Sequence, residues 1–173
     1  ALAVSLGGHL VLRAASLAPE RIGRSVLWVP GGLVKPPLLP MLSLMGEVVL
    51  YSMSPTRRRF AQLMSKTVTE QDAMTMDFLA DSFRYVVADR RFPKPLDDGA
   101  LVGWGAPVML VAHENDVVFP PDALAKRAQE LIPRLDRVLR IDAWKHMPPF
   151  ARERQRPVMD EIIPFLRGEE SLD

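Results

Sequence analysis

The chain opens with Ala1-Leu2-Ala3-Val4-Ser5-Leu6-Gly7-Gly8, in which a short apolar run leads to a serine flanked by small residues. This order predicts a strand, a sharp turn at Ser5 and then a helix. Such a turn lifts a serine hydroxyl above the edge of a sheet. It also brings strand and helix close together and holds the serine in an unfavourable backbone region, so Ala3 and Gly7 are small for steric reasons. We therefore interpret Ser5 as a candidate nucleophile.

Four short apolar runs predict strands, and helical patterns lie between or after them. The runs cover residues 2–4, 25–29, 108–112 and 137–141. Strands that alternate with helices indicate an α/β fold with a parallel sheet. Helices are predicted from Leu6 to about Leu17, after Pro120-Pro121, and over the last apolar stripe before Gly168.

The segment 33–100 contains no run typical of a strand and carries two amphipathic helical stripes instead. The stripes are Phe60, Leu63, Met64 and Val68, and then Met76, Leu79, Phe83 and Val86, at the spacing of one helix face. Six of the nine methionines also fall in this segment. Methionine fills irregular gaps in a packed layer and also suits an adaptable wall over an apolar pocket, and both interpretations remain open here.

These patterns divide the chain into three parts. Residues 1–32 are expected to form the elbow at Ser5, the first helix and the following strand of a core. Residues 33–100 are expected to form a helical lid or cap inserted into that core. Residues 101–173 complete the core with the loops that carry an acid and a histidine. The basic, proline-interrupted stretch from Arg90 to Pro95 is predicted to be an extended connector back to the sheet.

Composition narrows the class of partner. The 173 residues are 48% hydrophobic and 25% charged, and the net charge is +1, so no strong field attracts nucleic acid or anionic lipid. We expect a small-molecule partner and no nucleic acid. The sequence has no cysteine, which excludes a disulfide and a thiolate metal site and favours a cytoplasmic location. The most apolar region, 25–50, is broken by prolines and charges and is not expected to span a membrane.

A serine hydroxyl needs a general base to activate it and a further group to orient that base. Of the three histidines, His146 follows the last predicted strand, on a loop at the sheet edge where ligands bind in open α/β folds. His9 falls within the first helix and is expected to be a packing residue. His113 ends a strand, so it could line a site, but a structural role in the following turn is the interpretation we favour.

The orienting acid is sought after the strand that precedes His146. Glu114 and Asp116 both lie there, and we choose Asp116 for its position four residues before Pro120. The candidate residues then follow the order Ser5, Asp116, His146, each on a loop after a strand. That order is typical of α/β hydrolases.

With these residues in place, the chain resembles the C-terminal part of an α/β-hydrolase-fold protein over essentially its whole length. The elbow of that family is similar to residues 3–7, its aspartate turn to residues 110–120, and its histidine loop with the closing helix to residues 144–166. Three residues depart from the family pattern. Ala3, His113 and Lys145 stand where glycine is common, and we expect the Lys145 side chain to point outward into solvent.

The resemblance implies a serine hydrolase that cleaves carboxylic esters with an apolar moiety through an acyl-enzyme. Ser5 would attack, His146 would carry the proton and Asp116 would stabilise the imidazolium, with no cofactor and no metal. The family also contains hydrolases of carbon–carbon bonds, perhydrolases and amidases, which use the same three residue types. A non-catalytic binding member or an inactive truncated product is the alternative from another class.

Members of the family are longer than this chain, and their first strands have no counterpart in it. The loop that gives their second oxyanion-hole amide is also missing, which leaves the backbone N–H of Leu6 as the expected donor. Loss of one donor costs roughly a hundred- to thousandfold in rate, so these residues alone are expected to be a poor catalyst. The strand before Ser5 would have an open edge, and we expect it to pair with a missing N-terminal segment.

Overall fold

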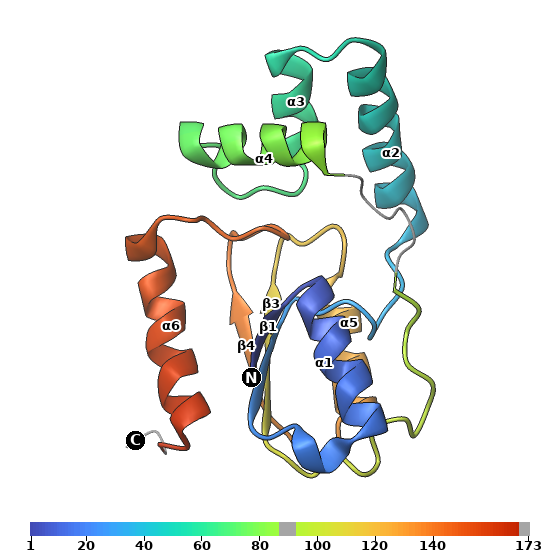
Figure 1. Ribbon diagram of the computed structural model, residues 1–173, viewed down its shortest axis with the longest axis vertical. Coiled ribbons are helices and arrows are strands. Elements are labelled where there is room, and N and C mark those ends of the chain that lie inside the picture. Colours follow the sequence, from blue (N-terminus) through green and yellow to red (C-terminus); the bar gives the residue numbers. More distant parts are fainter. Residues whose placement is uncertain (87–92, 170–173) are drawn as a thin grey trace.

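The computed structural model describes residues 1–86 and 93–169, so the predicted connector from Arg90 to Pro95 lies largely outside the described residues. The elements in chain order are β1 (Leu2–Val4), α1 (Leu6–Leu17), the 3-10 helix η1 (Pro19–Arg21), β2 (Ser25–Trp28), α2 (Leu38–Met53), α3 (Arg57–Met64), α4 (Ala73–Tyr85), β3 (Val108–His113), α5 (Pro121–Leu131), β4 (Leu135–Ile141) and α6 (Arg152–Arg167). The predicted alternation of strands and helices is confirmed (Figure 1).

The four strands form one parallel sheet in the order β1-β2-β3-β4. The register places Ala3 beside Leu27, Leu27 beside Leu110 and Leu110 beside Val138. Strand β4 begins two residues before its predicted start, because Leu135 pairs with Val108 ahead of an irregularity in the ladder. The predicted fold class, an α/β fold with a parallel sheet, is correct.

Helices cover both faces of this sheet, with α1 and α5 on one face and α6 on the other (Figure 1). Successive residues of β2 alternate between the two layers, since Leu27 packs with α1 and α5 while Val26 and Trp28 pack against α6. A sheet buried on both faces has strands that are apolar at every position, not at alternate ones. This explains why β2 and β3 read as continuous apolar runs in the sequence.

Helices α2, α3 and α4 lie between β2 and β3 in the chain and beyond the carboxyl ends of the strands in space (Figure 1). They have a hydrophobic cluster of their own, formed by Phe60, Leu63, Met64, Val68 and Leu79. We call residues 33–86 the helical segment. The first predicted stripe runs about one turn beyond α3, which ends at Met64, and the second runs one residue beyond α4, which ends at Tyr85.

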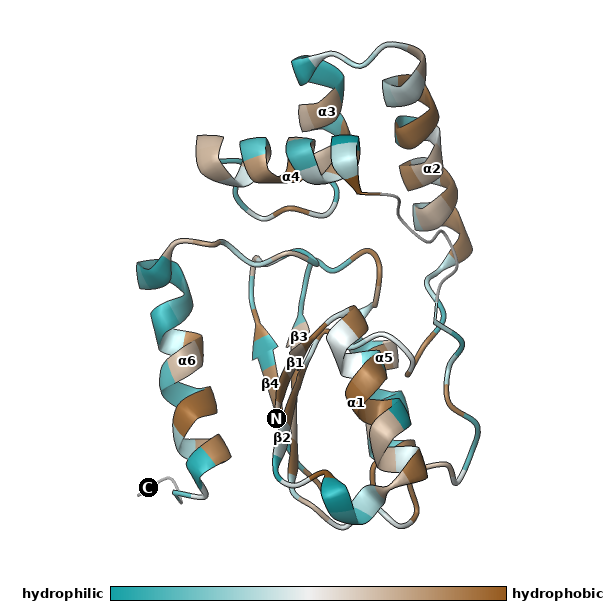
Figure 2. Cartoon of the chain, in the orientation of Figure 1, coloured by the Kyte–Doolittle hydropathy of each residue, from teal (hydrophilic) through white to brown (hydrophobic). Residues whose placement is uncertain are grey.

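Helix α2 has no counterpart among the predicted stripes, because its sequence is mostly apolar and its apolar residues do not form a single face (Figure 2). None of its residues is fully buried, and Leu39 and Met53 are 79% and 77% exposed. In the part of the chain that the structure describes, no helix is both long and apolar enough to cross a membrane. The methionines of this segment differ in environment, since Met64 is buried in the cluster of the helical segment while Met74 is exposed.

The start of α1 lies very close to the backbone that follows β2. A Cβ atom added to Gly8 would lie 2.9 Å from Cα of Pro30 and nearer still to its Cβ. We predict that Gly8→Ala lowers the free energy of unfolding of the full-length protein by about 1–3 kcal/mol, because strand and helix must move apart.

The matched control is Gly46→Ala in α2, where an added Cβ would meet nothing within 4 Å. That change is expected to raise stability by up to about 1 kcal/mol through helix propensity. Chemical denaturation measures both variants. Equal effects of the two substitutions would contradict the close approach of α1 to Pro30.

Candidate functional site

Ser5 occupies the sharp turn between β1 and α1, with φ 49° and ψ −112°. Its N–H donates to the carbonyl of Trp28 at 2.9 Å, and its carbonyl accepts from the N–H of Gly31 at 2.9 Å. A non-glycine residue in such a conformation costs on the order of 1–3 kcal/mol and persists only where the surroundings hold it. The two hydrogen bonds, to the last residue of β2 and to the chain just after it, hold Ser5 in this conformation.

Three non-glycine residues have positive φ among those that the structure describes: Ser5, Val29 at 40° and Ala143 at 62°. They follow β1, β2 and β4, so all three lie at the carboxyl edge of the sheet. Such values are especially rare for a β-branched residue such as Val29. Backbone strain of this kind gathers at functional sites.

Ser5, His146 and Asp116 form one chain of hydrogen bonds at this edge. Ser5 Oγ lies 2.9 Å from His146 Nε2, and His146 Nδ1 lies 2.8 Å from Asp116 Oδ2. Asp116 is 4% exposed, and its other oxygen accepts from the backbone N–H groups of Val118 and Phe119 at 2.7 and 3.0 Å. Because the carboxylate only accepts, Nδ1 carries the proton and Nε2 is free to accept from the hydroxyl.

Glu114, the other carboxylate of this loop, takes a different partner. It pairs with the guanidinium of Arg140 on β4, which also bonds Asp122 at 2.8 Å. The hydrogen bond from Arg140 lowers the pKa of Glu114. Glu114 is therefore bound in an ion pair at the surface, whereas Asp116 lies within hydrogen-bond distance of His146.

His9 and Lys145 contact other parts of the molecule. The ring of His9 packs on Gly32, where an added Cβ would clash with Nδ1 of His9. Burial, and then the charge of Arg13, lowers the pKa of His9. Lys145 Nζ donates to the carbonyl of Ser65 at 2.6 Å, so its ammonium group bonds the helical segment and not solvent alone.

His113 is fully buried beneath the site, between two tryptophans and the histidine loop. The indole N–H of Trp28 donates to its Nε2 at 2.6 Å, so its Nδ1 carries the proton that is donated to the carbonyl of Lys145 at 2.5 Å. Trp144 packs edge-on at 5.4 Å between ring centroids. Burial lowers the pKa of His113, which is therefore neutral and fixes the backbone next to His146.

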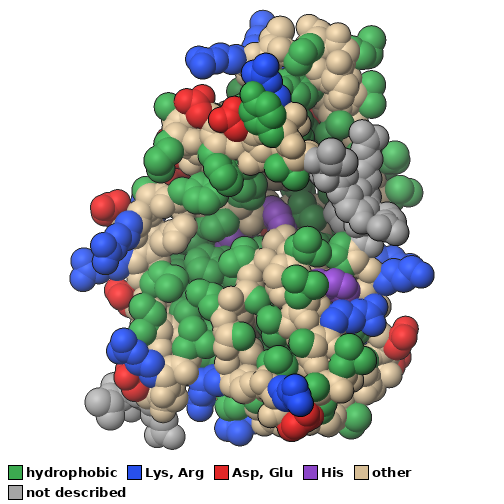
Figure 3. All heavy atoms as spheres, viewed as in Figure 1, with side chains coloured by type: hydrophobic (Ala, Val, Ile, Leu, Met, Phe, Trp, Pro, Cys, Tyr) green, Lys and Arg blue, Asp and Glu red, His purple; other side chains and the backbone are tan. Residues whose placement is uncertain are grey.

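Leu6 is the first residue of α1, and its side chain is 59% exposed. The first N–H groups of a helix have no acceptor within the helix, so they are available to an anionic oxygen. Figure 3 shows a hollow between the helical segment and the sheet, with histidine side chains on its wall. Within residues 1–86 and 93–169, no three potential ligand side chains come together in a way that could hold a metal ion.

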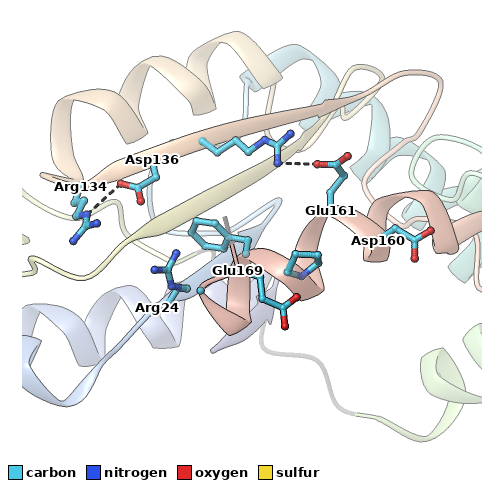
Figure 4. Close-up of a pocket in the computed structure, with 10 residues that line it drawn as sticks. Arg24, Arg134, Asp136, Asp160, Glu161 and Glu169 are labelled. Atoms are coloured by element: carbon cyan, nitrogen blue, oxygen red, sulfur yellow. Dashed lines mark hydrogen bonds and ion pairs between the residues drawn. The ribbon is translucent and has the colours of Figure 1, made fainter. Parts of the chain in front are cut away.

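A cavity of about 780 Å³ lies at the opposite, amino edge of the sheet (Figure 4). Its lining includes Arg24 before β2, Arg134 before β4 and Glu169 after α6. Charged side chains of the lining form ion pairs with one another, among them Arg137 with Glu161 at 2.7 Å. The cavity is therefore remote from Ser5 and takes no part in the hydrogen bonds that join Ser5, His146 and Asp116.

No protein-family model matches the sequence, and no curated protein is similar to it. Solved structures are similar in fold. Naproxen esterase (carboxylesterase NP) from Bacillus subtilis aligns with 98% of this chain and 59% of its own, at TM-score 0.72 and 16% identity. The 2-hydroxy-6-oxo-6-phenylhexa-2,4-dienoate hydrolase from a Rhodococcus species aligns with 96% of this chain and 63% of its own, at TM-score 0.66 and 17% identity.

The similarity establishes the class of fold. The chain has the α/β-hydrolase fold, which these structures share over 96% to 98% of its length. It spans 59% to 63% of the length of the first three similar structures, which include a serine hydrolase from Cycloclasticus at TM-score 0.68.

Two residues near His146 were not among the sequence-based candidates. Trp28 reads as a buried strand residue, and nothing in its neighbourhood along the chain indicates that it bonds His113. Thr69 lies on the connection between α3 and α4, and its hydroxyl contacts the histidine loop. Both contacts join segments more than seventy residues apart, so no local pattern could have indicated them.

The neutral, buried state of His113 makes stability depend on pH. Its pKa is lowered in the fold from 6.5, so the unfolded chain binds a proton that the folded chain does not. We predict that the free energy of unfolding falls as pH drops below about 6.5, with a contribution from this residue of at most about 1.4 kcal/mol per pH unit.

Denaturation of the full-length protein between pH 7.5 and 5.5 measures this slope, and His113→Gln should make it shallower. The lowered pKa of His9 acts in the same direction but is present in both proteins, so the difference isolates His113. An unchanged slope in the variant would contradict the neutral state of His113.

Proposed function

We propose that the full-length protein is a serine hydrolase of carboxylic esters with an apolar moiety. The observation that carries this proposal is the hydrogen-bonded chain from Ser5 Oγ through His146 to Asp116, with distances of 2.9 and 2.8 Å. A serine joined to a histidine that is held by a buried carboxylate is the arrangement that activates a hydroxyl. The absence of cysteine supports a cytoplasmic location as part of the same proposal.

In this mechanism His146 Nε2 takes the proton of Ser5 as Oγ attacks the ester carbonyl. The imidazolium that forms is stabilised by Asp116 and then gives its proton to the leaving alcohol, which departs and leaves an acyl-enzyme. A water molecule, deprotonated by His146, attacks the acyl group and releases the acid. Ser5 then recovers its proton.

The negative oxygen of each tetrahedral intermediate needs donors placed in advance. The backbone N–H of Leu6 lies at the N-terminal end of α1. The partial positive charge at this end of the helix also favours an anion. We propose this N–H as one oxyanion donor, with a second supplied by chain outside residues 1–173. No cofactor or metal takes part in this scheme.

Apolar surface beyond the strand ends supports an apolar substrate. The helical segment lies over the carboxyl edge of the sheet, and its helix α2 is mostly apolar, with Leu38, Leu39 and Leu42 exposed (Figure 2). We propose that this segment acts as a lid over an apolar acyl or alcohol group. The other reactions open to the same three residues are cleavage of a carbon–carbon bond, peracid formation and amide hydrolysis.

Covalent labelling tests the nucleophile. We predict that a fluorophosphonate probe labels the full-length protein and that Ser5→Ala abolishes the label, because Ser5 is the serine that bonds His146. Ser16→Ala is the matched control, since its hydroxyl is exposed on α1, the helix that follows Ser5, and bonds the carbonyl of Arg13. Undiminished labelling of Ser5→Ala would refute the assignment, and absence of labelling in the native protein would favour a non-catalytic role.

A substrate panel tests the class of bond. We expect turnover of nitrophenyl esters to rise from acetyl to medium-length acyl groups, because apolar surface is then buried at about 25 cal/mol per Å². The panel should include vinylogous diketones, anilides and a peracid assay with hydrogen peroxide. If only the diketones are turned over, the protein is a hydrolase of carbon–carbon bonds and not of esters.

The open edge of β1 supports a further strand. Among the described residues β1 ends the sheet, and Leu2 and Val4 are 43% and 44% exposed on it. We propose that a strand from outside residues 1–173 pairs with this edge and brings the second oxyanion donor. Ester hydrolysis by residues 1–173 alone should then be at least about a hundredfold slower than by the full-length protein. Equal rates would contradict both the pairing and the second donor.

A further inference from the structure

The peptide groups on either side of His146 are held from two directions. On the side of the sheet, Nδ1 of His113 donates to the carbonyl of Lys145 at 2.5 Å. Nδ1 carries the proton because Nε2 of the same ring accepts a hydrogen bond from Trp28. On the opposite side, the connection between α3 and α4 runs parallel to the histidine loop, with Val68 bridged to Met147. His146 therefore lies between a contact from the core and a contact from the helical segment.

Thr69 makes the second contact with its hydroxyl group. Thr69 Oγ1 accepts from the N–H of Lys145 at 2.9 Å and donates to the carbonyl of Met147 at 2.7 Å. The residue before His146 and the residue after it are thus joined through one side chain. A hydroxyl that donates once and accepts once is needed here, because one partner is an N–H and the other a carbonyl.

Backbone hydrogen bonds place this hydroxyl accurately. The N–H of Thr69 donates to the carbonyl of Met147 at 3.1 Å, and the N–H of Met147 donates to the carbonyl of Thr67 at 2.8 Å. Val68 is 1% exposed and belongs to the hydrophobic cluster of the helical segment. The connection that carries Thr69 is consequently anchored in that segment while it contacts the histidine loop.

We propose that Thr69 is a positioning residue for His146, and that through it the helical segment controls how well the base is aligned with Ser5. This inference rests on the proposed serine-hydrolase function. Small displacements of a catalytic group are costly, since a misplacement of about 1 Å can lower a rate about a hundredfold. Without the Thr69 hydroxyl, the loop around His146 keeps the contact from His113 and the backbone bonds at Met147. It loses the bond that holds the N–H of Lys145 and one of the two bonds to the carbonyl of Met147.

The test compares Thr69→Val and Thr69→Ala, which lack the hydroxyl, with Thr69→Ser, which keeps it, all in the full-length protein. We expect kcat for an ester and the rate of fluorophosphonate labelling to fall about tenfold or more in the first two, with KM changed less than about twofold, because alignment and not substrate binding is lost. Thr69→Ser should restore both rates to within about threefold. Thr69→Ala serves if Thr69→Val does not fold.

Thr75→Val is the matched control. Thr75 is also buried in the helical segment, but its hydroxyl bonds Asp72 at the start of α4 and does not contact the histidine loop. We expect its kcat to stay within about twofold of the native value. An equal loss in Thr75→Val, a Thr69→Ser variant as slow as Thr69→Ala, or a native rate in both variants without the hydroxyl would each overturn the proposal.

A second readout separates this proposal from the proposed function. Nuclear magnetic resonance of the His146 ring, assigned with a His146→Gln variant, reports its position without any turnover. Loss or broadening of the Nδ1–H signal in Thr69→Ala, with recovery in Thr69→Ser, supports positioning even if Ser5→Ala shows that the protein is no serine hydrolase. An unchanged ring signal overturns positioning even if the hydrolase assignment holds.

Discussion

Parallel pairing of β1, β2, β3 and β4 brings the residues that follow each strand to one edge of the sheet. Ser5 follows β1, Asp116 follows β3 and His146 follows β4, although up to 141 residues separate them in the chain. Burial of both sheet faces keeps this edge fixed, because neither layer of helices can shift without exposing apolar surface. The position of every reacting group proposed above depends on that constraint.

The edge stores backbone strain, and hydrogen bonds between loops hold it. Ser5 has a positive φ and is tied to the carbonyl of Trp28, while the side chain of the same tryptophan donates to His113. His113 in turn fixes the carbonyl of Lys145, beside His146. One residue of β2 therefore supports both the serine and the histidine, through its backbone in one case and its indole in the other.

The helical segment contributes more than a cover for the edge. Its own cluster of buried side chains includes Val68, and the bonds from the neighbouring Thr69 reach both flanks of His146. Lys145 Nζ adds a further bond to the carbonyl of Ser65. In the proposed enzyme, one part of the chain both covers the substrate and aligns the base, so the position of the lid is linked to catalysis.

The sequence by itself determined the strand–turn–helix at Ser5, the extent of α1 and the order of the three candidate residues, because these follow from local apolar spacing and turn chemistry. It did not reveal α2, whose apolar residues on all sides give no periodic signal. Only the tertiary structure showed that Glu114 forms an ion pair with Arg140. It also showed that Trp28 donates a hydrogen bond to His113 and that Thr69 bonds the histidine loop. Those partners lie 26 to 85 residues apart, so each depends on how whole elements pack and not on preferences of neighbouring residues.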